Sequence, residues 1–405
     1  MTPQVVGERQ ETPPGANGSF PRAQFISPWA RIAESRRARL REIVEENIVP
    51  LVDEAERTQE FPTEVFRLLG QEGYLSIGAP VEQGGEGGGR SAEIMVVQEL
   101  TRAGAGITMS VVPYFIVRIA VFEFGSHEII DTVGQAMIKG ERVVGICMSE
   151  PDAGSDVASI RTRAVRTDGG WLINGSKMFI TNGTIATDLL VVARAEQDDV
   201  EGIGLFLLET DQPGYTARKL DKEASLASDT TEILFENCFV PDHRVIGSPT
   251  EGFRNAMRVL NGERILSAAR AIQLAHDSWN DAVAWAARTE VEGGKALDLQ
   301  GFQGPLAAAK GQLWLLDLAL ERTAWLWDSG DPAVAEASML KTLSTKISVE
   351  ITRLAQRMTG IHGIISENRI ARNARDTRLG TVTAGTEQIM HRILARQSGW
   401  PKASR

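Results

Sequence analysis

Cysteine and histidine are scarce in this chain of 405 residues. The two cysteines, Cys147 and Cys238, lie far apart, which argues against a disulfide framework and against a cysteine metal site. The five histidines are scattered, with no HxH or HxxxH spacing that would bring two imidazoles to one metal ion. The sequence therefore predicts no metal centre.

Positive charge and long apolar runs are also lacking. The chain has 43 Lys and Arg against 53 Asp and Glu, a net charge of −10, whereas a nucleic-acid binder needs a basic face. No run approaches the roughly 20 apolar residues that a membrane span requires. We therefore expect neither a nucleic-acid partner nor a membrane.

The composition that is present describes a folded protein of several domains. A hydrophobic fraction of 42% and a charged fraction of 24% exclude global disorder. The length exceeds the roughly 250–300 residues at which a single core stops growing, so two or three domains are expected. Residues 1–25 are rich in proline and glycine without an apolar period, which predicts a disordered tail. This tail resembles neither a secretory signal nor a transit peptide, so we expect a cytoplasmic, bacterial-type enzyme.

Apolar periodicity divides the remaining chain into three regions. Spacings of three and four between Leu40 and Ala55 predict a helix, which Pro50 should kink. From about residue 143, short apolar runs separated by Gly, Asp and Asn predict strands, and Asn174-Gly175 predicts a hairpin turn. Long helical runs follow at 253–288, 302–328 and 333–360. We predict an N-terminal helical domain (26–142), a middle β domain (143–250) and a C-terminal helical bundle (251–405).

Two segments of the predicted β domain carry candidate chemistry. Residues 148–156 (MSEPDAGSD) leave a strand and turn sharply, so that small residues offer backbone N–H groups to a ligand. Residues 174–183 (NGSKMFITNG) place Phe179 where it can cover a flat ring and Thr181 where it can bond the ring's edge. Taken separately, the first segment is better explained as a surface turn, and Phe179 is equally consistent with a core position.

In this order, the two segments resemble those of the acyl-CoA dehydrogenase family of flavoenzymes. The resemblance continues through residues 235–241, Glu263-Arg264, 360–363, Arg375-Asp376 and 384–389, and covers the chain from about residue 30 to its C-terminus. It implies an α+β fold with an N-terminal helical domain, a middle β-barrel and a C-terminal four-helix bundle. It also implies FAD, an acyl-CoA substrate, an electron-transferring flavoprotein as electron acceptor, and a homotetramer or a dimer.

The resemblance also assigns roles to individual residues. Those implied to contact FAD are Ile146, Met148, Ser149, Gly154, Ser155, Phe179, Ile180, Thr181, Arg288, Gln300, Gly360, Thr386 and Gln388. Arg288 and Gln300 should reach the FAD of a neighbouring subunit. Those implied to contact the thioester substrate are Ser155, Arg264, Ala384 and Gly385.

The catalytic base is the point at which the chain departs from the commonest pattern. Most members carry a glutamate directly before the Gly-Thr of the C-terminal motif, where this chain has Ala384. A minority, resembling isovaleryl- and long-chain acyl-CoA dehydrogenases, place it in a Glu-Arg pair on the first bundle helix, which is Glu263-Arg264 here. Glu263 shares a helical face with Ala256 and Leu260, and burial there would raise its pKa toward that of a general base. A structural ion pair is the alternative role.

The predicted reaction is therefore the α,β-dehydrogenation of an acyl-CoA to the trans-2-enoyl-CoA. Glu263 would remove the α-proton while hydride passes to flavin N5, and the placement of the base favours branched or bulky acyl groups. Alternatives on the same fold are an oxidase, a nitroalkane-oxidase-like enzyme or a desaturase of carrier-protein-bound acyl groups. A further alternative is a non-catalytic binding subunit, which Ala384 favours and Glu263 opposes.

Overall fold

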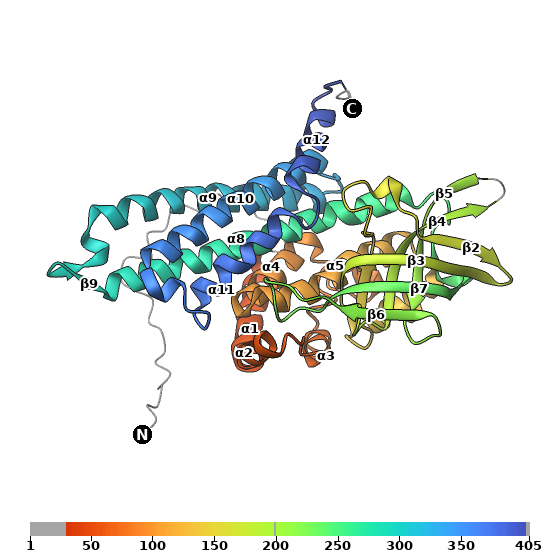
Figure 1. Cartoon of the computed structure of the whole chain (residues 1–405), viewed down its shortest axis with the longest axis horizontal. Helices are drawn as coiled ribbons and strands as arrows, with labels where there is room; N and C mark the ends of the chain where they lie inside the picture. Colours follow the sequence, from red (N-terminus) through yellow and green to blue (C-terminus); the bar gives the residue numbers. More distant parts are fainter. Residues whose placement is uncertain (1–29, 198–199, 402–405) are drawn as a thin grey trace.

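The computed structural model describes residues 30–197 and 200–401, so the predicted tail at 1–25 lies outside the described residues. Helices form the N-terminal region, a sheet the middle and long helices the C-terminal region, as predicted (Figure 1). The predicted boundaries near 142 and 250 fall in the connections between α7 and β1 and between β8 and α8.

The N-terminal helices enclose the main core. They are α1 (Ala30–Ile43), η1 (Val44–Ile48), α2 (Val49–Thr58), α3 (Glu64–Gln71), η2 (Val81–Gln83), α4 (Gly89–Ala103), α5 (Ala105–Phe124), α6 (His127–Ile129), η3 (Ile130–Gly134) and α7 (Gln135–Ile138). The helix predicted across Leu40–Ala55 is interrupted where expected. The π-helical turn η1 directly precedes α2, whose first turn contains Pro50, a residue with no N–H to continue the ladder.

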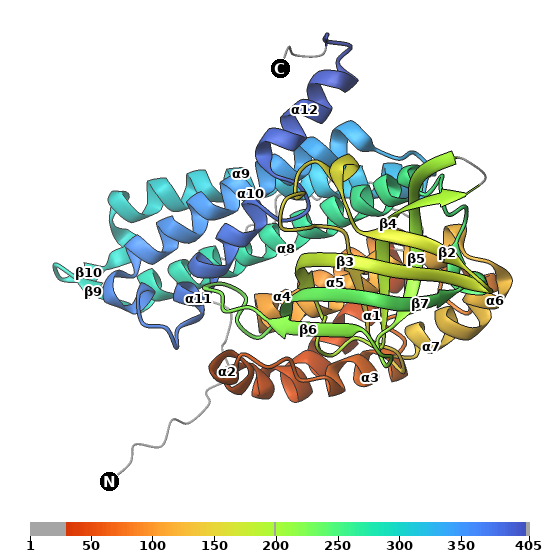
Figure 2. The same ribbon diagram turned by 45° about the vertical axis from the view of Figure 1, so that its right-hand side comes forward.

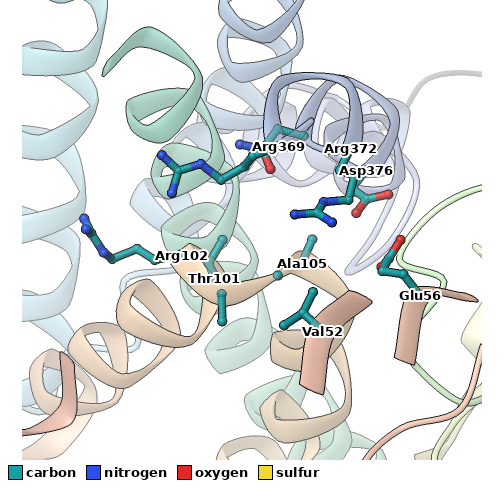
Figure 3. A pocket seen from close by; sticks show the side chains of 11 residues that line it. Val52, Glu56, Thr101, Arg102, Ala105, Arg369, Arg372 and Asp376 are labelled. Atoms are coloured by element: carbon teal, nitrogen blue, oxygen red, sulfur yellow. The ribbon is translucent and has the colours of Figure 1, made fainter. Parts of the chain in front are cut away.

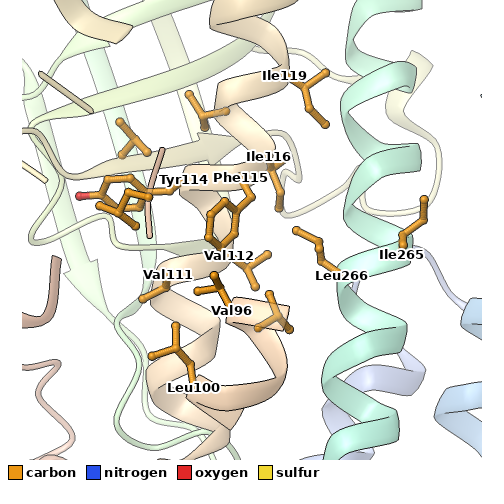
Figure 4. Packing of buried hydrophobic residues seen from close by; sticks show 14 of the residues in the cluster. Val96, Leu100, Val111, Val112, Tyr114, Phe115, Ile116, Ile119, Ile265 and Leu266 are labelled. Atoms are coloured by element: carbon orange, nitrogen blue, oxygen red, sulfur yellow. The ribbon is translucent and has the colours of Figure 1, made fainter. Parts of the chain in front are cut away.

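Helix α5 corrects one prediction. By length and composition it is apolar enough to cross a membrane, so the expectation that no run approaches a span was wrong. However, 94% of its most apolar window is buried inside the protein, where α5 packs against α4 and α8 (Figure 4). A helix surrounded by the core is apolar on all sides, and it therefore shows no amphipathic period.

The middle region is one eight-stranded sheet. Its strands are β1 (Val144–Cys147), β2 (Arg163–Thr167), β3 (Gly170–Thr181), β4 (Asp188–Gln197), β5 (Val200–Glu209), β6 (Tyr215–Lys219), β7 (Thr230–Pro241) and β8 (Val245–Ile246), with η4 (Val157–Ser159) and η5 (Asp242–Arg244) in connections. The order is β6-β7-β3-β2-β4-β5-β8, and β1 pairs in parallel with β4.

The hairpin predicted at Asn174-Gly175 is wrong. Strand β3 runs straight through this pair, and its register against β7 shifts between Ile173 and Gly175. Gly175 has φ 142°, so the glycine serves a β-bulge instead of a turn. The turn that joins β2 to β3 is at Asp168-Gly169, where Gly169 has φ 70°.

The C-terminal region is built on three long helices, as predicted. They are α8 (Phe253–Arg288), α9 (Gln300–Asp328) and α10 (Val334–Met358), and the shorter elements are β9 (Glu290–Val291), β10 (Gly294–Lys295), η6 (Ala296–Asp298), η7 (Gly360–Gly363), α11 (Arg369–Asp376), η8 (Thr377–Thr381) and α12 (Glu387–Gln397). Helix α8 packs on α9 and α10 and also on α4 and α5 (Figure 2). It is therefore the element that joins the bundle to the N-terminal core.

Candidate active site

A buried carboxylate organises the turn that follows β1. Glu150 accepts hydrogen bonds from the backbone N–H groups of Arg161 (2.6 Å) and Thr162 (2.9 Å), and from the Thr162 hydroxyl (2.6 Å). Its fourth donor is the fully buried Lys177 of β3, at 2.8 Å. Burial opposes ionisation, but the hydrogen bonds from Lys177, Thr162 and Arg161 lower the pKa of Glu150.

The same contacts join the two predicted motifs. Lys177 also donates to the carbonyl of Met148 (3.0 Å), and the N–H of Met178 donates to the carbonyl of Ser149 (2.9 Å). The structure thus brings Ile146, Met148 and Ser149 at the end of β1 beside the end of β3, as the sequence predicts. Gly154 and Ser155 lie beyond the turn and are exposed.

Phe179 has the features of a binding residue and not of a core residue. Its side chain is 69% exposed, and its backbone is left-handed, with φ 62°. The register of β3 against β7 shifts between Lys177 and Ile180, which turns Phe179 outward while Ile180 stays buried. A non-glycine residue in this conformation is strained, and such strain concentrates at functional sites.

Two residues near Phe179 carry free hydroxyl groups. Thr181 follows it on β3, and Ser149 is joined to β3 by the bond to Met178. Ser149 and Thr181 are half-buried, and neither hydroxyl has a hydrogen-bond partner within residues 30–197 and 200–401. An exposed aromatic face with unused polar groups suits a flat ring that carries polar atoms at its edge. These residues therefore fit the flavin ring of FAD.

Glu263 lies on α8 without a partner of its own. The side chain is half-buried, and in the described part of the chain it makes neither a hydrogen bond nor an ion pair. Burial raises its pKa, and the nearby charges of Arg264, Lys341 and Arg270 act in the opposite direction. A structural ion pair, the alternative role for Glu263, is therefore not observed.

Further along α8, unpartnered polar atoms lie on the buried side. Arg264 Nε, Ser267 Oγ and Arg270 Nη1 are buried and have no hydrogen-bond partner in the part of the chain that the structure describes. Arg264 has one weak bond, from Nη1 to Asn261 Oδ1 at 3.2 Å. Buried polar groups are normally satisfied, so unused donors here are what a polar ligand would occupy.

The loop before α12 is bonded to α10. Ala384 and Gly385 both have left-handed backbones, with φ 55° and 96°, and the Gly385 carbonyl accepts a hydrogen bond from Lys341 Nζ of α10. Thr386 is the N-cap of α12 and accepts from the N–H of Ile389 at 3.4 Å. Lys341, whose charge acts on Glu263, thus connects the predicted base to the predicted substrate loop.

Other predicted cofactor residues are not brought to this region within one chain. Arg288 ends α8 and Gln300 begins α9; both are exposed and flank the β9–β10 hairpin, at the opposite end of the molecule from β3 (Figure 1). Gly360 is exposed at the start of η7, and Gln388 is exposed on α12. Their predicted roles stay predictions.

A small cavity lies elsewhere, at the junction of α2, the α4–α5 turn and α11 (Figure 3). Its lining includes Glu56, Arg102, Arg369, Arg372 and Asp376, and none of the predicted site residues. Its charged groups pair with one another or with neighbours; Arg372, for example, bonds Asp53 at 2.7 Å. It is an interdomain contact region separate from the candidate site.

The sequence reasoning did not single out three residues of this region, Glu150, Lys177 and Lys341. Glu150 and Lys177 lie inside the two motifs, but they are 27 residues apart, so no short stretch of sequence indicates that they pair. The sequence around Lys341 does offer an indication. Lys341 shares a helix face with the small residues Ala337, Ser344 and Thr345, which are three and four residues away and buried. A charged residue on a buried helix face calls for a partner or a ligand.

Comparisons with known proteins agree along the whole described chain. The acyl-CoA dehydrogenase N-terminal, middle and C-terminal domain models match residues 33–141, 145–238 and 250–399. The chain is 30% identical over 359 residues to a 3-(aryl)acrylate reductase of Clostridium sporogenes, covering 88% of this chain and 95% of that protein. It is 32% identical over 360 residues to a mitochondrial 2-methylacyl-CoA dehydrogenase of Solanum tuberosum, covering 87% of each.

Solved structures share the architecture. A glutaryl-CoA dehydrogenase of Mycobacterium smegmatis in complex with FADH2 has a TM-score of 0.87 at 25% identity, over 93% of this chain and 96% of that chain. A chain of a structure described as the electron transferring flavoprotein of Acidaminococcus fermentans has a TM-score of 0.86 at 27% identity, over 90% and 97%.

Proposed function

The chain belongs to the acyl-CoA dehydrogenase family of FAD-dependent oxidoreductases, and we propose that it oxidises an acyl-CoA thioester to the trans-2-enoyl-CoA with Glu263 as the base. The observation that carries this proposal is the unpartnered Glu263 carboxylate on α8, near which three further polar atoms, Arg264 Nε, Ser267 Oγ and Arg270 Nη1, also have no hydrogen-bond partner among the described residues.

The residues that would hold the cofactor are those that end β1 and β3. Phe179 offers an exposed aromatic face, and the hydroxyls of Ser149 and Thr181 are free to bond the edge of a ring. FAD, when bound, accepts the hydride that leaves the substrate β-carbon. The Glu150–Lys177 pair fixes the spacing of the two strand ends on which this contact depends.

Glu263 performs the proton step. A carboxylate that takes up the α-proton must be ionised beforehand and basic enough to accept it. Burial raises the pKa of Glu263, and the cations Arg264, Lys341 and Arg270 keep the ionised form accessible. Because position 384 is alanine, it supplies no carboxylate that could take the place of Glu263.

The absence of a side chain beyond Cβ at Ala384 also bears on the acyl group. Alanine takes less space than the glutamate that most members of the family carry at this position, which supports branched or bulky acyl chains as substrates. The resemblance to a protein named 2-methylacyl-CoA dehydrogenase supports the same class. The similarity to a structure described as an electron transferring flavoprotein supports such a protein as the electron acceptor.

The test is Glu263→Gln, measured as flavin reduction by a panel of straight, branched and aromatic acyl-CoAs under anaerobic conditions. We expect the FAD spectrum to persist and the reduction rate to fall by about 10²–10⁴-fold, because a positioned base contributes that much. Exchange of the α-proton with solvent should be lost together with it. Glu387→Gln is the matched control, since Glu387 is an exposed carboxylate that also acts on Lys341. Near-parental reduction by Glu263→Gln would defeat the assignment.

A second candidate is the reverse reaction. The relative from Clostridium sporogenes is named a reductase, and proton transfer at the α-carbon by Glu263 serves either direction. Photoreduced holoenzyme mixed anaerobically with enoyl- and arylacrylyl-thioesters distinguishes them. Re-oxidation of the flavin much faster than its reduction by the saturated thioesters would favour the reductase.

A further inference from the structure

Helix α10 carries a cation on a face that is otherwise small and buried. Lys341 is 1% exposed, and its neighbours on this face include Ser338, Ser344 and Thr345. Burying an ammonium costs free energy unless its hydrogen bonds and its charge are matched. The groups that bond the Lys341 ammonium and match its charge therefore indicate its role.

The hydrogen bond of Lys341 is made to the substrate loop. Its ammonium donates to the Gly385 carbonyl, 44 residues away along the chain. Both Ala384 and Gly385 have positive φ, and a Cβ on Gly385 would lie 2.7 Å from Met390 Cε. Ala384 is a non-glycine residue in the left-handed region and is therefore strained, and such a conformation persists only where neighbouring contacts hold it.

The charges around Lys341 come from two helices. Glu263 and Arg264 face it from α8, and Glu387 faces it from α12. Glu263 in turn is faced by Arg264, Lys341 and Arg270. Lys341 is the one member of this group that both acts on Glu263 and bonds the Gly385 loop.

We propose that Lys341 is a positioning residue for the dehydrogenation, which holds the Ala384–Gly385 loop against α10 and keeps a positive charge beside Glu263. The inference rests on the proposed role of Glu263. One ammonium thereby holds the predicted substrate loop and favours the ionised carboxylate that accepts the α-proton. Loss of this charge would leave Glu263 protonated over a wider pH range.

The experiment uses the FAD-loaded enzyme without substrate. The infrared band of the protonated Glu263 carboxyl, identified by its loss in Glu263→Gln, is followed against pH. In Lys341→Met we expect its titration midpoint to rise by about one pH unit, because one favourable charge is removed. Lys341→Arg and the control Lys346→Met, which changes an exposed lysine on the same helix, should keep the parental midpoint.

A reciprocal measurement covers the case in which Lys341→Met does not fold. Burial lowers the pKa of Lys341 to about 8, and Glu263 opposes that shift. In the near-isosteric Glu263→Gln, ¹³C-labelled Lys341 should therefore titrate at a lower pH than in the parent. An unchanged lysine pKa, or an unchanged Glu263 midpoint in folded Lys341→Met, would overturn the inference. If the shifts appear but no thioester reduces the parental flavin, the proposed function fails while the coupling stands.

Discussion

At the scale of single residues, the burial that makes Glu263 a suitable base also lowers the stability of the folded protein. Burial raises its pKa in the folded chain above the ordinary value of 4.5. A carboxyl whose pKa is raised by folding binds its proton more tightly in the folded state. Folding stability is therefore greatest at low pH with respect to this group, and it is lost as the pH rises from about 4.5 through the folded pKa.

This sign predicts that Glu263→Gln is more thermally stable than the parent at pH 8. The amide carries no charge to desolvate, so the difference in melting temperature should shrink as the pH falls toward 5. Differential scanning calorimetry of the two holoenzymes across this range measures it. A lower melting temperature for Glu263→Gln at pH 8 would contradict the raised pKa.

Glu150→Gln tests the buried carboxylate of the turn after β1. The change leaves the buried ammonium of Lys177 without its counter-charge. We expect the free energy of unfolding to fall by about 3–5 kcal/mol, as is typical when one partner of a buried ion pair is removed. Because the pair also fixes the turn after β1, FAD should dissociate more readily, as seen by the rise in free-flavin fluorescence. Asp152→Asn is the control, since Asp152 is exposed and its pairing with Arg161 lies on the surface. Equal FAD retention in both variants would argue against the positioning role of Glu150.

At the scale of elements, helices with a regular amphipathic pattern were predicted correctly, whereas the turn predicted from a single Asn-Gly pair was wrong. Helices α8, α9 and α10 were placed within a few residues, because their apolar stripes repeat over many turns. Helix α5 was missed because a fully buried helix has no polar side to set the period. The hairpin turn predicted at Asn174-Gly175 was wrong because a glycine with positive φ can form a β-bulge as well as a turn.

The candidate site divides in the same way. The strand-end motifs and Glu263 could be singled out as candidates because each lies in a short stretch of sequence that resembles a family motif. The outward turn of Phe179 depends on a register shift against β7, and the contact of Lys341 with Gly385 joins residues far apart in the chain. Both depend on tertiary packing, which no window of sequence encodes.

The bulge gives a prediction at this scale. A Cβ on Gly175 would lie 2.8 Å from the Cα of Thr162, a residue that itself bonds Glu150. We expect Gly175→Ala to lower the free energy of unfolding by about 1–3 kcal/mol, as overpacking does. Gly311→Ala is the control: its Cβ would meet nothing within 4 Å, and it lies inside α9, where alanine should stabilise by about 0.5–1 kcal/mol. Denaturant unfolding of both measures the contrast, and equal midpoints would contradict it.

At the scale of the whole molecule, the bundle presents apolar side chains outward. Trp314 and Leu315 on α9 and Leu343 on α10 are 46%, 60% and 51% exposed. Exposed apolar groups gathered on packed helices are typical of protein–protein contact surfaces. Arg288 ends α8 and Gln300 begins α9, at the end of the bundle remote from β3 (Figure 1), so a second copy would have to bring these predicted FAD contacts to a flavin held at β3.

We therefore expect the parent to be a homotetramer, or a dimer, of the 44.1 kDa chain, and the double variant Leu315→Glu with Leu343→Glu to dissociate. Buried carboxylates without partners oppose association, so multi-angle light scattering should show a smaller particle. The smaller particle should also lose FAD, because the contacts of Arg288 and Gln300 are lost with the neighbour. Val81→Glu, a change at a 68% exposed residue of the N-terminal region, should alter neither property. A parental monomer saturated with FAD would refute both the assembly and the contacts across subunits.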